Sequence, residues 1–195
     1  MNSLVKVAPN IKKFNDYIFE VKKGTKPMML SGLTDSGKVH LAYSTRFYSD
    51  KPICIITYNE LQAKKIVKDL EFFGEKVKFF PKRDTVSFDY IAESKDVLYQ
   101  RISALNKLAK GEAKVIVTTI EAIMQKMITK ESLFKNVMNL KVGDTLNLAT
   151  LKEKLILLGY ERYDLIEGKG QFSIRGDIID TLKGMGFSID EDMQF

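Results

Sequence analysis

The first 125 residues alternate short apolar runs with longer amphipathic segments, and this alternation restricts the fold more than any other feature. Each run is rich in Val, Ile, Phe or Met and is bounded by Gly, Pro or charged residues, which predicts strands over 26–32, 52–58, 76–81 and 114–119. Because the runs are continuously apolar, we expect a parallel sheet that helices cover on both faces. The sequence therefore predicts an α/β domain.

Amphipathic spacing fills the intervals between these runs. One predicted helix covers about 38–48, a second covers 59–73, and a third places its apolar residues at helical spacing over about 97–108. Strands that alternate with helices of this length are typical of crossover units in a parallel sheet.

After about residue 127 the pattern changes to that of a small α+β domain. Leucines at 151, 155 and 158 predict a helix, and the tight turn Gly168-Lys169-Gly170 within 163–180 predicts a β-hairpin. We therefore expect a first α/β part at 1–127, an inserted α+β domain at 128–175, and a return strand with an atypical or truncated tail at 176–195.

Composition and charge narrow the class of protein. With 45% hydrophobic and 29% charged residues, no apolar run long enough to span a bilayer and no signal-peptide pattern, the chain is predicted to be cytoplasmic and without a membrane partner. The formal charge of +6 permits nucleic-acid binding, but the lysines are spread along the chain rather than clustered. The single cysteine, Cys54, lies in an apolar run and is expected to be a buried thiol.

The segment GLTDSGKV at 32–39 has the spacing of a phosphate-binding loop except at its last position. Gly32, Gly37 and Lys38 match the Walker A pattern, but Val39 stands where Ser or Thr would hold Mg²⁺. We therefore expect a vestigial or structural loop with no catalytic residues, no metal and no cofactor. Weak nucleotide binding without turnover and full catalysis stay open as alternatives.

No other motif predicts chemistry. The only histidine, His40, has no sequence neighbours that would complete a triad or a zinc site, so a surface or capping role is expected.

The most specific stretch is GKGQFSIRGDIID at 168–180. It resembles the signature near the end of the inserted domain in UvrB and in the N-terminal module of the transcription-repair coupling factor, and the order of the other segments agrees over roughly 15–180. Two features favour the coupling-factor family. Only about 34 residues separate Phe80 from Lys114, too few for the aromatic DNA-holding hairpin of UvrB, and Val39 makes the loop degenerate.

This resemblance implies a P-loop-NTPase-like (RecA or helicase-like) fold and a non-catalytic module that recruits UvrA through its inserted domain. Arg162 and Arg175 match UvrA-contacting arginines of the family, and Phe172 and Lys169 are further candidates on the same hairpin. Ser173 stands where UvrB has another arginine. The full-length family protein is an ATP-dependent DNA translocase, so RNA polymerase, DNA, ATP and Mg²⁺ are expected to belong to parts outside this chain.

Three alternatives stay open at this point. Arg175 is a candidate for an internal salt bridge with Asp177 or Asp164 instead of a partner contact. The chain is also compatible with a nucleotide-binding or ATP-hydrolysing subunit of DNA repair, which phosphate release lost on Lys38→Ala would indicate. A basic DNA-binding module would instead show duplex binding with a steep salt dependence.

Overall fold

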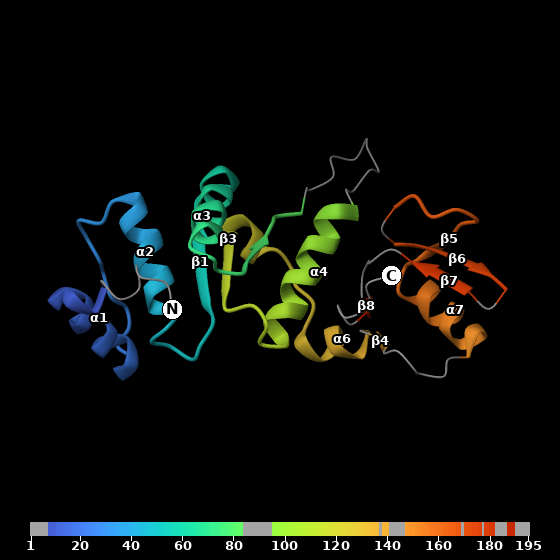
Figure 1. Cartoon of the computed structure of the whole chain (residues 1–195), viewed down its shortest axis with the longest axis horizontal. Helices are drawn as coiled ribbons and strands as arrows, with labels where there is room; N and C mark the ends of the chain where they lie inside the picture. The colour runs from blue at the N-terminus through green and yellow to red at the C-terminus, as the bar shows by residue number, and fades with distance from the viewer. Residues whose placement is uncertain are drawn as a thin grey trace. The chain divides into compact units, whose positions relative to one another are not determined.

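A computed structural model of the chain divides it into two compact units (Figure 1). The first unit is Met1–Lys82 with Lys107–Gln125, and the second is Arg83–Asn106 with Lys126–Phe195. Within them the structure describes residues 8–83, 95–136, 138–140, 147–168, 170–176, 178–181 and 187–189. The second unit thus includes Arg83–Asn106, which lies within the predicted first part at 1–127.

A parallel three-stranded sheet forms the centre of the first unit. Its strands are β1 (Ile53–Thr57), β2 (Val77–Phe80) and β3 (Val115–Thr119), in the order β1-β3-β2. Both outer strands run parallel to β3, in a register that places Val115 opposite Ile53 on one side and Val77 on the other. The predicted α/β class and three of the four predicted strands are confirmed.

Helices supply the rest of the first unit. The described elements are the short η2 (Ala8–Asn10), α1 (Lys12–Lys23), α2 (Asp35–Thr45), α3 (Glu60–Phe72) and α5 (Ile120–Met124). Asn59 caps α3, because its side-chain oxygen accepts a hydrogen bond from the Gln62 N–H at 2.8 Å. Side chains of α2, α3, β2 and β3 form the core, and its buried members are Val39, Tyr43, Ala63, Leu70, Val77, Val115 and Val117. All five residues of β3 are buried, as a central parallel strand requires.

The predicted strand at 26–32 is wrong. Residues 25–31 are irregular and exposed, and Met29 has 93% of its surface accessible. Among the described residues β1 is paired only with β3, so this apolar run has no neighbouring strand. An extended segment without a ladder partner leaves its backbone groups to water and is not stable as a strand.

Cys54 is also a correction, because it is exposed rather than buried. It lies on β1, an outer strand of the described sheet, where Ile53, Ile55 and Thr57 are more buried than Cys54 and Ile56. Partial desolvation still raises the pKa of the Cys54 thiol above its ordinary value.

The second unit combines helices with two small sheets. Its elements are most of α4 (Lys95–Ala109), α6 (Lys130–Lys135), β4 (Met138–Leu140), α7 (Leu148–Leu157), β5 (Glu161–Arg162), β6 (Gln171–Arg175), β7 (Ile178–Thr181) and β8 (Phe187–Ile189). Strand β4 pairs with β8 in parallel, and the other sheet has the order β5-β6-β7. Helix α7 packs against this second sheet through a core of Leu151, Leu155, Tyr160 and Phe172. The predicted helix with leucines at 151, 155 and 158 is confirmed.

The β-hairpin is formed by β6 and β7, around residues 176–177, and not around the predicted turn at 168–170. Strands β5 and β6 on either side of the glycine pair 168 and 170 are parallel, so this segment is not a hairpin turn. The antiparallel pair is β6 with β7, and Arg175 lies opposite Ile178, so only two residues connect the strands. Gly176 begins this connection with a φ of +60°, a conformation that favours glycine. This hairpin crosses the predicted domain limit at 175.

In the part of the chain that the structure describes, no helix is both long enough and apolar enough to span a membrane.

Candidate functional site

The glycine-rich loop at 32–39 is the start of a capped helix. Helix α2 begins at Asp35, and the Thr34 hydroxyl oxygen accepts a hydrogen bond from the Gly37 N–H at 3.1 Å. The Lys38 N–H donates to the Thr34 carbonyl oxygen at 2.9 Å. A phosphate-binding loop needs such amide groups to point at the anion. In this structure the N–H groups of Gly37 and Lys38 already donate to Thr34 and do not point at an anion.

The side chains at positions 38 and 39 also differ from those of a nucleotide site. The Lys38 ammonium lies 3.2 Å from an Asp35 carboxylate oxygen, and both side chains are exposed. Val39 is buried in the core of the first unit, where Tyr43 is one of its neighbours in the cluster. A hydroxyl at position 39 would therefore be buried among apolar side chains. It would not reach the solvent-exposed side of the loop, where a metal ion would be held.

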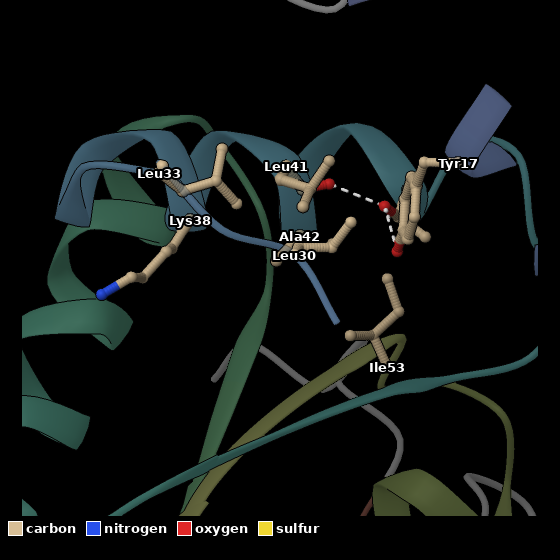
Figure 2. Close-up of a pocket in the computed structure, with 9 residues that line it drawn as sticks. Tyr17, Leu30, Leu33, Lys38, Leu41, Ala42 and Ile53 are labelled. Carbon is tan, nitrogen blue, oxygen red and sulfur yellow. Dashed lines mark hydrogen bonds between the residues drawn. The ribbon is translucent and has the colours of Figure 1, made fainter. Parts of the chain in front are cut away.

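A pocket of about 430 Å³ lies beside this loop (Figure 2). Its lining is mostly apolar and consists of Tyr17, Leu30, Gly32, Leu33, Lys38, Leu41, Ala42, Thr45 and Ile53. The Thr45 hydroxyl lies 2.7 Å from the Leu41 carbonyl oxygen and 3.2 Å from the Tyr17 hydroxyl oxygen. Figure 2 shows the Lys38 ammonium pointing away from this hydroxyl pair. The polar groups therefore do not converge on one point, as a triphosphate would require.

Metal-binding and histidine chemistry have little support in the described residues. No group of three or more His, Cys, Asp and Glu side chains is close enough to hold a metal ion there. His40 is partly buried, and its ring centroid lies 6.1 Å from that of Phe73 in a tilted arrangement. This contact indicates a packing role for His40.

Restoring a hydroxyl at the last loop position tests this interpretation. We expect Val39→Thr to lower the free energy of unfolding by about 1–3 kcal/mol, because it buries a hydroxyl in an apolar core. We expect no gain of phosphate release, because the neighbouring amides stay engaged. Urea unfolding and a phosphate-release assay measure the two effects, with Lys38→Ala as an exposed neighbour whose change should stay within about 0.5 kcal/mol. Hydrolysis gained by Val39→Thr would contradict a structural loop.

The two candidate docking arginines lie on the small sheet of the second unit. Arg162 ends the outer strand β5 and is exposed, and no ion pair of its side chain is found among the described residues. Arg175 ends β6, where its guanidinium pairs with the Asp180 carboxylate across the hairpin. The predicted internal salt bridge therefore exists, but with Asp180 as its partner. Asp164 uses its backbone carbonyl oxygen instead, which accepts from the Ser173 hydroxyl at 3.1 Å, and Asp177 lies outside the described residues.

Strand register separates these two arginines. Arg162 lies opposite Phe172, which belongs to the face that α7 covers. Arg175 alternates with Ile174 on β6 and has the same parity as Ser173, so register assigns it to the other face. The structure therefore does not place the two arginines on one face of the sheet.

Phe172 is a correction to the predicted docking residues. Its side chain is fully buried among Leu151, Leu155 and Tyr160, so it stabilises the domain and does not face a partner. Ser173, at the position of an additional UvrB arginine, is also buried. Lys169 lies outside the described residues.

Two buried features of the second unit were missed by sequence reasoning. A Cβ added to Gly170 would overlap the Tyr99 hydroxyl and lie 3.1 Å from Tyr99 Cζ, so α4 packs closely on this glycine. Arg101 is buried on the same helix, and burial, followed by the positive charge of Arg83, lowers the pKa of Arg101 below its ordinary value. Tyr99 and Arg101 both belong to the helical segment that the sequence predicted, but their distant neighbours could not be read from spacing.

Comparison with known proteins supports the resemblance that the sequence suggested. Residues 138–186 match the family model of the UvrB interaction domain. The chain is 32% identical over 86% of its length to the transcription-repair-coupling factor of Bacillus subtilis (strain 168). It is 27% and 28% identical over 84% of its length to the same factor from Staphylococcus aureus strains bovine RF122 / ET3-1 and USA300.

The chain is related to the transcription-repair-coupling factors. It spans 14% of the length of each of these relatives. The match to the UvrB interaction domain begins at β4 and includes α7 and the sheet β5-β6-β7. Both candidate docking arginines therefore lie inside the matched region, whereas the loop at 32–39 lies outside it.

Proposed function

We propose that this chain is a protein-interaction module of transcription-coupled DNA repair that docks UvrA through residues 138–186. The observation that carries this proposal is the exposed Arg162 on β5, inside the region that matches the UvrB interaction domain. An arginine at a protein interface offers a planar set of donors that suits a carboxylate on the partner. The expected partner surface is therefore acidic where it meets β5.

Arg175 takes a secondary part in this proposal. Its pairing with Asp180 involves two partly exposed side chains, and such surface pairs contribute about 0–1 kcal/mol. Exchange of Asp180 for a carboxylate of UvrA therefore costs little. The existing pair nevertheless reduces the net charge that Arg175 presents, so its loss should matter less than the loss of Arg162.

We further propose that the chain does not hydrolyse ATP by itself and that the loop at 32–39 is a remnant in a P-loop-like domain. The spacing of Gly32, Gly37 and Lys38 at the start of α2 supports the P-loop relationship. The use of the Gly37 N–H by Thr34 and the burial of Val39 support the loss of catalysis. Contacts with RNA polymerase and DNA, and ATP-driven translocation, are assigned to other parts of the longer relatives.

Nucleotide binding is the second candidate function, because Gly32 and Lys38 line the pocket beside the loop. Its signature would be ATP binding that Lys38→Ala weakens. The mostly apolar lining makes this candidate the weaker one.

Titration of the chain with purified UvrA tests the main proposal. We expect Arg162→Glu to raise the Kd at least about tenfold, since it reverses a charge at the interface, and Arg175→Glu to raise it by a smaller factor. Lys65→Glu is the matched control, because Lys65 is an exposed cation on α3 outside the matched region. Binding by Arg162→Glu equal to that of the unmodified chain would contradict the role of Arg162.

A further inference from the structure

Helix α3 exposes a row of large side chains on its outer face. Leu61 and Phe72 lie near its two ends with 81% and 85% of their surface accessible. Lys65 and Lys68 lie between them and are also exposed. Residues at i, i+4, i+7 and i+11 share one face of a helix, so these side chains form one row over about three turns, roughly 16 Å long. We define the α3 stripe as Leu61, Lys65, Lys68 and Phe72.

The core of the first unit does not use the α3 stripe. The inner face of the helix buries Ala63 and Leu70 completely, and Ile66 and Val67 pack against the same core. A helix that covers a core needs only one apolar face for this purpose. Single exposed apolar residues are ordinary on protein surfaces, but two that are aligned on the opposite face are available for a partner.

The fold holds both ends of the α3 stripe in place. Asn59 caps α3 and thereby fixes the first turn, which carries Leu61. At the other end the Phe72 ring meets the Phe73 ring edge-on at a centroid distance of 6.0 Å, and Phe73 stacks on Tyr43 of the core at 5.1 Å. Side chains that are already positioned lose less entropy when they bind a partner.

The lysines of the α3 stripe present charge that the helix itself does not neutralise. Lys64, beside the stripe, pairs with Glu60 at 3.3 Å. No ion pair of Lys65 or Lys68 is found among the described residues, although Asp69 lies one turn after Lys65. The whole chain also carries a formal charge of +6. The stripe therefore favours a partner that offers carboxylates between two apolar groups.

Other kinds of partner fit this arrangement less well. A phosphate backbone would pair with the lysines but offers no apolar groups to Leu61 and Phe72. A helix that lies on a membrane has a continuous apolar face with cations beside it, whereas here the cations separate the apolar residues. Antiparallel pairing with the stripe of a second copy would place lysines against lysines. An acidic amphipathic helix complements all four side chains.

We propose that the α3 stripe docks an acidic amphipathic helix of a protein partner. Carboxylates of that helix pair with the two lysines of the stripe, and its apolar side chains cover Leu61 and Phe72. This surface belongs to the first unit and lies outside residues 138–186, which match the UvrB interaction domain. The inference therefore stands or fails independently of UvrA docking.

The test uses a synthetic helical peptide with two leucines eleven residues apart and glutamates between them on the same face. Fluorescence anisotropy gives its Kd for the whole chain. We expect Lys65→Glu/Lys68→Glu to raise the Kd at least about tenfold, because it reverses the charges. Leu61→Ser/Phe72→Ser should also raise it at least about tenfold, because it removes the apolar anchors. A charge-swapped peptide, with lysines in place of the glutamates, should bind the unmodified chain much more weakly.

Matched control variants lie on α1 of the same unit. Lys12→Glu/Lys13→Glu reverses two exposed charges there, and Phe19→Ser removes an aromatic ring with 65% of its surface accessible. Both should leave the Kd for the acidic peptide unchanged. Circular dichroism checks the fold of each variant.

The inference is overturned if the folded, unmodified chain does not bind the acidic peptide or binds both peptides equally. It is also overturned if both folded α3 variants bind the acidic peptide as tightly as the unmodified chain does. Duplex DNA and phosphatidylserine vesicles are titrated in parallel, because either could use the lysines alone. Binding of one of them that Lys65→Glu/Lys68→Glu abolishes, without peptide binding, would replace the acidic helix with that ligand.

Discussion

Phe172→Ala is expected to destabilise the second unit by about 3–5 kcal/mol, the usual cost of removing a fully buried phenylalanine ring. The ring fills the space between α7 and the sheet β5-β6-β7, and its neighbours Leu151 and Leu155 are fixed on α7. These leucines cannot fill the space left by the ring unless α7 moves towards the sheet. The effect should therefore be a loss of cooperative stability throughout 148–181.

Amide hydrogen exchange measures this loss separately for each unit, which matters because a chain with two compact units need not unfold in one transition. Protection of α7 and β6 should fall, whereas protection of β3 in the first unit should stay unchanged. Arg162→Ala is the exposed control in the same sheet, with an expected change within about 0.5 kcal/mol. Full protection in Phe172→Ala together with weaker UvrA binding would instead restore Phe172 as a partner contact.

Gly170→Ala is expected to destabilise the second unit by about 2–5 kcal/mol, from two separate causes. Gly170 has a φ of +78°, a conformation that costs a residue with a Cβ about 1–2 kcal/mol. The new methyl group would also overlap the Tyr99 hydroxyl, and overpacking of this kind typically costs about 1–3 kcal/mol. Gly168→Ala is the control, because a Cβ there meets no atom within 4 Å.

A double-mutant cycle separates the two causes. Tyr99→Phe removes the hydroxyl oxygen but keeps Cζ, which is 3.1 Å from the added Cβ. The double variant Gly170→Ala/Tyr99→Phe should therefore recover most of the overlap part of the loss and keep the backbone part. Urea unfolding of the four proteins gives the coupling free energy. Additive effects of the two substitutions would contradict the close packing of α4 on Gly170.

Sequence patterns predicted the strands of the first unit well where partners exist. The runs at 52–58, 76–81 and 114–119 form one parallel sheet, and the all-buried β3 explains why its run is continuously apolar. The run at 26–32 is also apolar, with two Met and one Leu but no Val, Ile or Phe, and it has no strand beside it among the described residues. A ladder partner is a property of the fold rather than of the run. Cys54 was misplaced for a related reason, because sequence does not reveal which strand is outermost.

The second unit contains two candidate turn sequences, and the sequence alone did not show which one forms the hairpin. Both Gly168-Lys169-Gly170 and the Gly-Asp pair at 176–177 are turn sequences, and only the latter connects antiparallel neighbours. Gly170 of the first pair packs closely instead against Tyr99, a residue about 70 positions earlier in the chain. The residues next to Gly170 in the sequence do not indicate its contact with Tyr99.

The candidate site was only partly predictable. The resemblance selected Arg162 and Arg175, and the structure leaves Arg162 exposed. Phe172 was assigned to the surface because the side of β6 that faces α7 cannot be known before the register is fixed. The exposure of Leu157 was not predicted, because a leucine near the end of an apolar helix is typical of a core residue.

The most direct test of UvrA docking through residues 138–186 is a hydrogen-exchange footprint of the whole chain upon addition of UvrA. If UvrA docks on this region, hydrogen exchange should become slower in 156–175, which includes β5, and stay unchanged in the loop at 32–39. Protection confined to 28–45, or no protection anywhere despite measurable binding, would contradict docking through the region that matches the UvrB interaction domain.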